Sequence, residues 1–219
     1  MAVKKKLLKK YRHYTNVVSL IKLLTDKKLL LSDPNYWDDR NDRAAMNEYK
    51  KRNEFSCVLA VCLSKTGETY HHWSVFSKGI AGVCVEFDAR ELDSDISRCS
   101  VPTGTKLFGR DVKYYPISVL KRLRLESDQL GFAKRISYKD EKEFRVMYTS
   151  TNHAHRSDKI FECPIRIVSV SQILLSPWMY DTQIPSTKKA INSIDGCAGI
   201  KIAKSTLVQN DTWIRELTK

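Results

Sequence analysis

The stretch Phe55-Ser-Cys-Val-Leu-Ala-Val-Cys-Leu-Ser64 contains the longest uninterrupted apolar run of the sequence and decides the fold class. This stretch and Gly82-Val-Cys-Val-Glu-Phe-Asp88 are short and rich in Val, Leu and Cys, which is typical of buried strands. Residues 68–78 between them predict a short helix. Further strands are expected at Leu8–Tyr14, Lys28–Ser32, Val112–Tyr115, Glu143–Tyr148, within Ile160–Leu175 and at Ile200–Lys204. This order predicts an α+β protein with a mixed or mostly antiparallel sheet.

The remaining segments bear on domain organisation. Residues 89–110 are interpreted as rich in turns, and residues 117–134 predict one or two amphipathic helices. The sequence has no internal repeat and no linker rich in Pro, Gly or Ser, and 219 residues fit one hydrophobic core. We therefore expect a single domain over residues 1–219, with a basic N-terminal tip at residues 1–10.

The charge of the chain is strongly positive. Lys and Arg number 38 against 25 acidic residues, which gives a net charge of +13. Such an excess favours a polyanionic partner such as nucleic acid. The 42% of hydrophobic residues predicts a packed core and excludes a mainly disordered chain. The N-terminal tip could bind an acidic antitoxin protein as readily as nucleic acid.

Several classes of protein are disfavoured. The longest apolar run, Cys57–Leu63, is far shorter than the roughly 20 residues of a membrane span, and the basic N-terminus does not lead into a secretory signal, so we expect a cytoplasmic protein. The six cysteines form no CxxC pair, which favours reduced, buried thiols, and the doublet His71-His72 lacks nearby ligands, so no metal is expected. The motifs GxGxxG, GxxxxGK[ST], HExxH and GxSxG are missing, which disfavours the enzyme classes that they mark.

Three separated segments carry candidate site residues. In Tyr11-Arg12-His13-Tyr14-Thr15 the alternation of a strand places His13 and Tyr11 on one face and Tyr14 on the other, and Thr15 or Asn16 is expected to cap the following helix. The alternative is that His13 is an ordinary histidine at a strand edge, bonded to its neighbours.

The second segment is Lys139-Asp-Glu-Lys-Glu-Phe-Arg-Val146. If it is a strand, Glu141, Glu143 and Arg145 share a face that points outward or into a cleft, with the two carboxylates about 7 Å apart. Carboxylates at that distance can act on one substrate without sharing a proton. The alternative is a solvated, charged edge strand.

The third segment begins with Ser64 at a strand end and continues with the aromatic residues Tyr70, Trp73 and Phe76 on the next helix. These rings could form a platform for a flat ligand ring. The alternative is that they pack in the core.

In combination, His13-Tyr14-Thr15 before a helix, a strand ending in Ser, a later strand–helix–strand with Trp, and Glu-x-Glu-Phe-x-Val resemble the ADP-ribosyltransferase superfamily. The nearest branch is that of DarT-like toxins, which modify nucleic acids. The chain is also similar to a bacterial family with an Asn-Asp motif, here within Trp37-Asp-Asp-Arg-Asn41-Asp42, and a Glu-x-Glu-aromatic-Arg motif. Together these motifs span residues 11 to about 150.

The resemblance implies a split β fold in which two small sheets flank an NAD cleft, with peripheral helices. It implies that His13 holds a ribose of NAD, and that Tyr14 and Thr15 shape the nicotinamide pocket. Glu143 would be the catalytic carboxylate, which binds the ribose 2′-hydroxyl and stabilises the oxocarbenium-like charge. Glu141 would be a second catalytic residue that orients or deprotonates the acceptor.

Further residues are assigned to NAD binding by the resemblance. They are Trp37, Asn41, Asp42, Ser64, Trp73 and Arg145. The stacking tyrosine of the superfamily is not identifiable, so Trp37, Tyr70 and Trp73 are its candidate substitutes. Asn41 and Asp42 either hold NAD or the acceptor, or cap the following helix. Arg40, Arg43 and Arg145 are candidate partners of the pyrophosphate, and Arg145 is preferred because it faces the same way as Glu143.

These observations lead to one main expectation and two alternatives. The main expectation is an NAD-dependent ADP-ribosyltransferase that modifies a nucleic acid, RNA being favoured over DNA, and acts as a bacterial toxin or anti-phage effector. The first alternative is an NAD glycohydrolase or a protein ADP-ribosyltransferase. The second is a non-catalytic nucleic-acid-binding module, since basic residues alternate with tyrosines in the segment 113–124.

Overall fold

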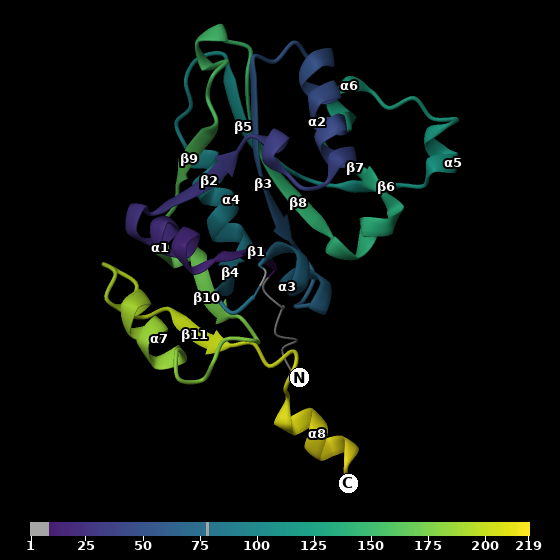
Figure 1. Cartoon of the computed structure of the whole chain (residues 1–219). Helices are drawn as coiled ribbons and strands as arrows, with labels where there is room; N and C mark the ends of the chain where they lie inside the picture. Colours follow the sequence, from purple (N-terminus) through teal and green to yellow (C-terminus); the bar gives the residue numbers. More distant parts are fainter. Residues whose placement is uncertain (1–8, 78) are drawn as a thin grey trace, which may run out of the picture. The chain divides into compact units, whose positions relative to one another are not determined.

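The computed structural model describes residues 9–77 and 79–219, so most of the basic tip at residues 1–10 lies outside the described residues. Helices alternate with eleven strands in these residues, which confirms the predicted α+β class (Figure 1). The chain forms two compact units, and each is described by itself. Unit 1 comprises the described residues up to 27, 67–91 and 166–219, and unit 2 comprises residues 28–66 and 92–165.

Unit 1 contains four strands in the spatial order β11-β10-β4-β1. They are β1 (Lys10–Asn16), β4 (Gly82–Asp88), β10 (Val170–Leu175) and β11 (Lys201–Lys204). The pairs β1–β4 and β4–β10 are antiparallel, and β10–β11 is parallel. Its helical elements are α1 (Val17–Asp26), α3 (Tyr70–Phe76), η4 (Ile167–Ser169), α7 (Ile184–Asn192) and α8 (Asp211–Leu217).

The first helix of unit 1 shows how the sequence sets its limits. The Asn16 side chain accepts a hydrogen bond from the Ser19 N–H at 2.9 Å, so Asn16, not Thr15, is the N-cap of α1. Lys27 ends the helix in the left-handed conformation, with φ 53°. The apolar residues at helical spacing, Leu20 and Leu24, are fully buried.

Unit 2 contains five antiparallel strands in the order β5-β8-β3-β2-β9. They are β2 (Lys28–Ser32), β3 (Cys57–Ser64), β5 (Thr105–Asp111), β8 (Glu143–Ser150) and β9 (Ile160–Pro164). A separate parallel pair is formed by β6 (Lys113–Tyr115) and β7 (Ala133–Arg135). Because β8 pairs with β3 on one side and β5 on the other, the interpretation of this strand as a solvated edge is wrong.

The helical elements of unit 2 are mostly short. They are η1 (Pro34–Tyr36), α2 (Arg40–Arg52), α5 (Ile117–Leu120), α6 (Ser127–Leu130), η2 (Ile136–Glu141) and η3 (His153–His155). The unit boundary falls within α4 (Ala89–Arg98). Helix α2 lies against the sheet (Figure 1), where Met46 and Tyr49 pack with Val58, Ala60 and Met147. This packing fixes the first turn of α2 relative to β8.

Two expectations on secondary structure are wrong. Residues 89–110 contain the helix α4 and the strand β5 instead of turns, and residues 117–134 form two single helical turns joined by loops. The six cysteines are free thiols, four of them buried. Among residues 9–77 and 79–219, no helix has the length and apolar character needed to cross a membrane.

Candidate active site

The backbone around Glu143 is fixed from both sides. Glu143 begins β8 opposite Ser64, the last residue of β3. The Ser64 hydroxyl donates to the carbonyl of Glu141 at 2.8 Å, and the Glu143 N–H donates to the Tyr114 hydroxyl at 2.8 Å. Glu141 lies in η2, and Lys142 between the two glutamates is left-handed, with φ 44°. The expectation that both glutamates lie on one strand is therefore wrong, because the chain turns between them.

One ammonium group lies among three carboxylates. Lys134 Nζ is 2.7 Å from Glu141 Oε2, 3.1 Å from Glu143 Oε2 and 3.7 Å from Asp42 Oδ2. The Lys134 side chain is 9% exposed. Burial lowers the pKa of Lys134, but the charges of Glu143, Glu141 and Asp42 outweigh this and hold it well above its ordinary value. Lys134 is therefore a permanent cation at this site.

Arg145 is the second cation of the cluster and is fully buried. Nη1 and Nη2 donate to the two oxygens of Asp42 at 3.0 and 2.8 Å, and Nε donates to Glu143 Oε1 at 2.7 Å. Nη2 also lies 2.7 Å from Glu143 Oε1, and Nη1 donates to the Gly131 carbonyl at 2.9 Å. The Trp37 ring lies over the guanidinium, 4.9 Å from its centroid. Each nitrogen of the Arg145 guanidinium thus donates to a partner within the protein, and the side chain has no exposed surface to offer a pyrophosphate.

We call Asp42, Lys134, Glu141, Glu143 and Arg145 the ion network. Within it, burial raises the pKa of Glu143, but Arg145 and Lys134 outweigh burial and lower it to about 2. The neighbouring Cys62 is half-buried, and desolvation and the charge of Glu143 raise the pKa of its thiol well above the ordinary value, so it stays neutral. Glu143 is therefore an ionised carboxylate at neutral pH, held in one position by charge-assisted hydrogen bonds.

The network is buried rather than exposed on an outward face. Glu141, Glu143 and Arg145 are 5%, 4% and 0% exposed. On the same strand, Val146 and Tyr148 are also buried, at 0% and 2%. Side chains on both faces of β8 are therefore buried, so of the two expected positions, outward or into a cleft, the outward one is wrong.

The first turn of α2 supplies the acidic partner of Arg145. The Asp39 side chain accepts from the Asn41 N–H at 2.8 Å and is the N-cap of α2. Asn41 is exposed, whereas Asp42 is 5% exposed and turned into the network. Neither of the two predicted residues caps the helix, and only Asp42 joins the site.

In unit 1, the predicted residues lie on β1 and α3. Tyr14 is buried, stacks on His72 with ring centroids 5.0 Å apart, and meets the edge of Trp73 at 5.4 Å. Trp73 has no exposed surface and donates through Nε1 to Glu68 at 2.9 Å, so it is a core residue. His13 and Thr15 are half-buried and pair with Val85 and Val83 of β4.

Two residues of the site were missed in the sequence. Lys134 and Tyr114 are partners in the register of β6 and β7, so this small sheet brings both of them to Glu143. No local pattern marks either residue, because their approach to β8 depends on tertiary packing. Within the part of the chain that the structure describes, no group of three His, Cys, Asp or Glu residues is arranged to hold a metal.

No protein-family profile matches the sequence, and no curated protein matches it. Among solved structures, the chain is similar to DarT of Thermus sp. 2.9 in complex with ADP-ribosylated ssDNA, with a TM-score of 0.46 and 10% identity, covering 94% of this chain and 98% of that chain. The complex of the same DarT with NAD+ is similar with a TM-score of 0.46 and 10% identity, covering 91% of this chain and 96% of that chain. The complex with carba-NAD+ has a TM-score of 0.44 and 9% identity, covering 91% of this chain and 96% of that chain.

Proposed function

We propose that the protein is an NAD-dependent ADP-ribosyltransferase that modifies a nucleic acid, with Glu143 as the catalytic carboxylate. The observation that carries the proposal is the ionised Glu143, fixed by Arg145 and Lys134 at the start of β8. The order of motifs around it supports the choice of chemistry. The biological role that follows is that of a bacterial toxin or anti-phage effector, with an antitoxin protein as its partner.

The chemistry requires a fixed negative charge. When nicotinamide leaves NAD, positive charge develops on the ribose, and a preorganised carboxylate stabilises it without reorganising. A carboxylate also accepts a hydrogen bond from a ribose hydroxyl. Glu143 fits both tasks, since its low pKa keeps it ionised at neutral pH. Glu141, bonded to Lys134, is proposed to orient the acceptor.

The pyrophosphate of NAD needs a cation outside the ion network. Arg145 is fully engaged, and Arg43 donates to the Asn35 carbonyl at 3.4 Å. Arg40 at the start of α2 is exposed and forms no ion pair among the described residues. We therefore assign the pyrophosphate to Arg40. The roles of His13, Tyr14 and Thr15 in NAD binding stay predictions.

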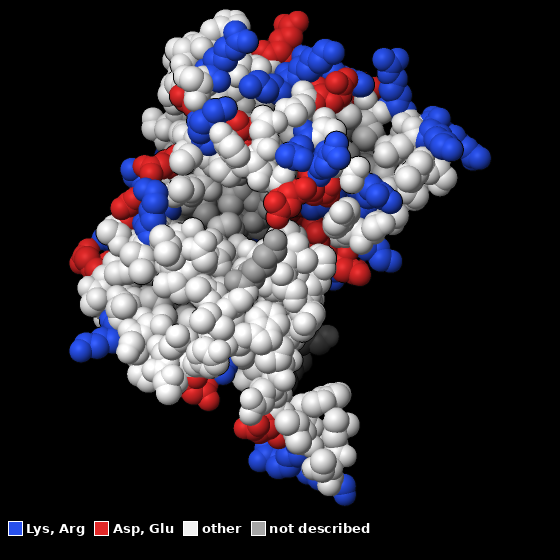
Figure 2. Space-filling view, in the orientation of Figure 1, with Lys and Arg blue, Asp and Glu red and all other residues white. Residues whose placement is uncertain are grey.

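The charge pattern supports a nucleic-acid acceptor. The segment 112–125 holds the cations Lys113, Lys121, Arg122 and Arg124 and no acidic residue. None of these four forms an ion pair among the described residues, so they are available to phosphates. On the face drawn in Figure 2, basic side chains gather over the part of unit 2 that holds α2, α5 and α6.

The test is transfer of labelled ADP-ribose from NAD to total RNA and to single-stranded DNA. We expect Glu143→Gln to lower transfer by at least about 100-fold, as for the loss of one charge-stabilising group. Asp140→Asn, an exposed neighbour, is the matched control and should leave transfer unchanged. The double variant Glu143→Gln/Lys134→Met removes one charge of each sign and should remain folded but inactive.

The labelled product identifies the acceptor, RNA being our first choice. NAD loss that does not depend on nucleic acid would instead indicate a glycohydrolase. Equal transfer by the wild type and a folded Glu143→Gln variant would refute the assignment of Glu143.

One observation favours a second candidate, the non-catalytic nucleic-acid-binding module. Glu143 is 4% exposed, and its charge is compensated by Arg145 and Lys134, as in a purely structural ion cluster. This candidate predicts salt-sensitive binding of RNA or DNA without any consumption of NAD.

A further inference from the structure

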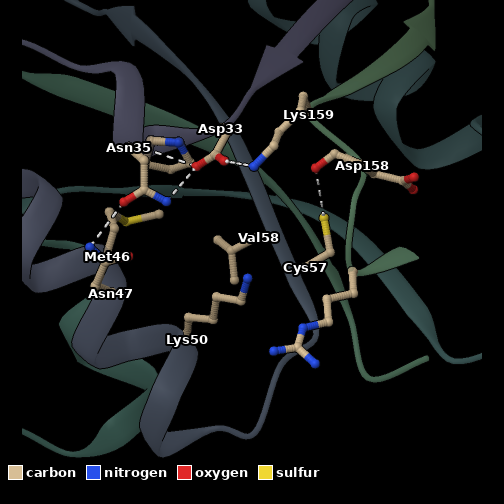
Figure 3. A pocket seen from close by; sticks show the side chains of 11 residues that line it. Asp33, Asn35, Met46, Asn47, Lys50, Cys57, Val58, Asp158 and Lys159 are labelled. Atoms are coloured by element: carbon tan, nitrogen blue, oxygen red, sulfur yellow. Dashed lines mark hydrogen bonds and ion pairs between the residues drawn. The ribbon is translucent and has the colours of Figure 1, made fainter. Parts of the chain in front are cut away.

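Unit 2 contains a small cavity whose lining shares no residue with the ion network. It has a volume of about 60 Å³ and lies between α2, the start of β3 and the loop that follows η3. Asn47 and Lys50 reach it from α2, and Lys159 lines it from the loop (Figure 3). Arg156 of the same loop is also part of the lining. We propose that this cavity binds a phosphate group, with Lys50 and Arg156 as its cationic ligands.

The carboxylate in the wall is already neutralised. Asp33 is 7% exposed, and its Oδ1 accepts from the backbone N–H and the side-chain amide of Asn35, both at 2.9 Å. Its Oδ2 accepts from Lys159 Nζ at 3.0 Å. Burial raises the pKa of Asp33, but these bonds outweigh burial and lower it. Asp33 and Lys159 thus form a satisfied pair that leaves the other cations uncompensated.

The second carboxylate of the lining, Asp158, is bonded through Oδ2 to His155 Nδ1 at 2.8 Å, and its side chain is directed away from the cavity in Figure 3. The Cys57 thiol donates to the Asp158 carbonyl at 3.8 Å, and burial raises its pKa to about 11, so the thiol is neutral at pH 7. The Cys57 thiol therefore adds no charge to the cavity floor.

Two cations at the cavity have no anionic partner. Lys50 and Arg156 form no hydrogen bond or ion pair through their side chains among the described residues. Figure 3 shows Lys50 reaching from α2 toward Val58 on the cavity floor. Asn47 uses one N–H to donate to Asn35 Oδ1 at 3.0 Å, and its amide has a second N–H.

Size and chemistry together indicate the ligand. A volume of about 60 Å³ equals roughly that of two water molecules in the liquid, which suits one tetrahedral oxyanion and is too small for a nucleobase. A guanidinium binds two phosphate oxygens at once, and an ammonium adds a point charge. The phosphate could come from a free phosphorylated compound or from the backbone of a nucleic acid.

The first experiment is calorimetric titration of the full chain with inorganic phosphate in a phosphate-free, low-salt buffer. We expect saturable binding that Lys50→Ala/Arg156→Ala weakens at least tenfold. The charge-matched control Lys51→Ala/Lys106→Ala, at two exposed lysines outside the cavity, should bind like the wild type. Asn47→Asp, which adds a carboxylate at the rim and removes no cation, should also weaken binding.

The second arm identifies the source of the phosphate. Labelled oligothymidylate and oligouridylate are bound to the wild type and challenged with inorganic phosphate, and they are also titrated into Lys50→Ala/Arg156→Ala. If phosphate displaces the oligonucleotide and the variant binds it more weakly, the cavity holds a backbone phosphate. If neither the added phosphate nor the substitutions change oligonucleotide binding, the cavity holds a free phosphorylated compound. The proposal is overturned if the wild type and Lys50→Ala/Arg156→Ala bind phosphate with the same affinity, or if Lys51→Ala/Lys106→Ala loses as much affinity as Lys50→Ala/Arg156→Ala. No substituted residue belongs to the ion network, so failure here leaves the proposed transferase standing.

Discussion

Arg145 holds both carboxylate oxygens of Asp42, with Nη1–Oδ1 at 3.0 Å and Nη2–Oδ2 at 2.8 Å, although the two residues lie 103 positions apart. The pair joins the first turn of α2 to β8, an inner strand of the unit 2 sheet. Both side chains are buried, so neither charge can be solvated if the other is lost. One guanidinium thus ties the first turn of α2 to Glu143, in addition to the packing of Met46 and Tyr49 and the bonds from Lys134 and Tyr114.

The first prediction concerns this pair. Asp42→Asn should lower the free energy of unfolding by about 1.5–3 kcal/mol, because two charge-assisted hydrogen bonds of the buried Arg145 lose their carboxylate acceptor while the bond to Glu143 remains. Urea unfolding at pH 7 measures the change. Asn41→Ala, at the exposed neighbouring position, should change stability by no more than about 0.5 kcal/mol. Equal stability of Asp42→Asn and the wild type would show that the pair does not anchor α2.

The second prediction is a pH dependence that originates at Glu143. Its pKa is lowered from 4.5 to about 2 in the folded state, so its contribution to stability is complete above pH 4.5 and is lost as the pH falls toward 2. The stability difference between wild type and Glu143→Gln should be on the order of 3 kcal/mol at pH 7 and should shrink over this window. Unfolding by urea at a series of pH values tests it. A difference that stays constant with pH would contradict the low pKa.

The third prediction concerns Lys134. Lys134→Met removes the cation that faces three carboxylates, so the pKa of Glu143 should rise toward its ordinary value. If transfer requires ionised Glu143, the acid limb of the pH–rate profile should move to higher pH. Lys106→Met, at an exposed position of β5, is the matched control and should leave the profile in place. If the acid limb of the pH–rate profile of Lys134→Met stays at the wild-type pH, Lys134 does not set the pKa of Glu143 in the reaction.

The fourth prediction tests the packing between β5 and β8. A Cβ at Gly109 would overlap the Phe144 ring, whereas a Cβ at Gly67 would meet no atom within 4 Å. Gly109→Ala should therefore destabilise the protein by about 1–3 kcal/mol through overpacking, and Gly67→Ala should not destabilise it. Thermal unfolding of the two variants measures this. Destabilisation of both to the same extent would argue against the close approach of Gly109 and Phe144.

Strands with strong local patterns could be predicted from the sequence. Gly82–Asp88 and Lys28–Ser32 have the expected bounds, because continuous apolar runs end there in polar residues. The helix α4 was missed although its signals are present. Asp88 accepts from the Arg90 N–H at 2.9 Å, and the buried Leu92 and Ile96 lie four residues apart. The many polar residues between them were interpreted as turns.

The site could be predicted only in part. Glu143 and Arg145 share a face of β8, as the alternation indicated, and they are bonded to each other. The burial of that face depends on β5 and α2, and neither contact is visible in the local pattern. Lys134 lies on the three-residue strand β7 and pairs with Tyr114 of β6, 20 positions earlier. Only the tertiary structure therefore brings Lys134 to the ion network.

The loop between β6 and β7 begins and ends beside residues that bond to the Glu143 segment, Tyr114 at one end and Lys134 at the other. Among the described residues this loop carries three cations without an ion pair, Lys121, Arg122 and Arg124. If a ligand bound at the loop changes the bonds from Tyr114 and Lys134, it changes the proton affinity of Glu143. By thermodynamic linkage, protonation of Glu143 would then change the affinity of the loop for that ligand by the same factor.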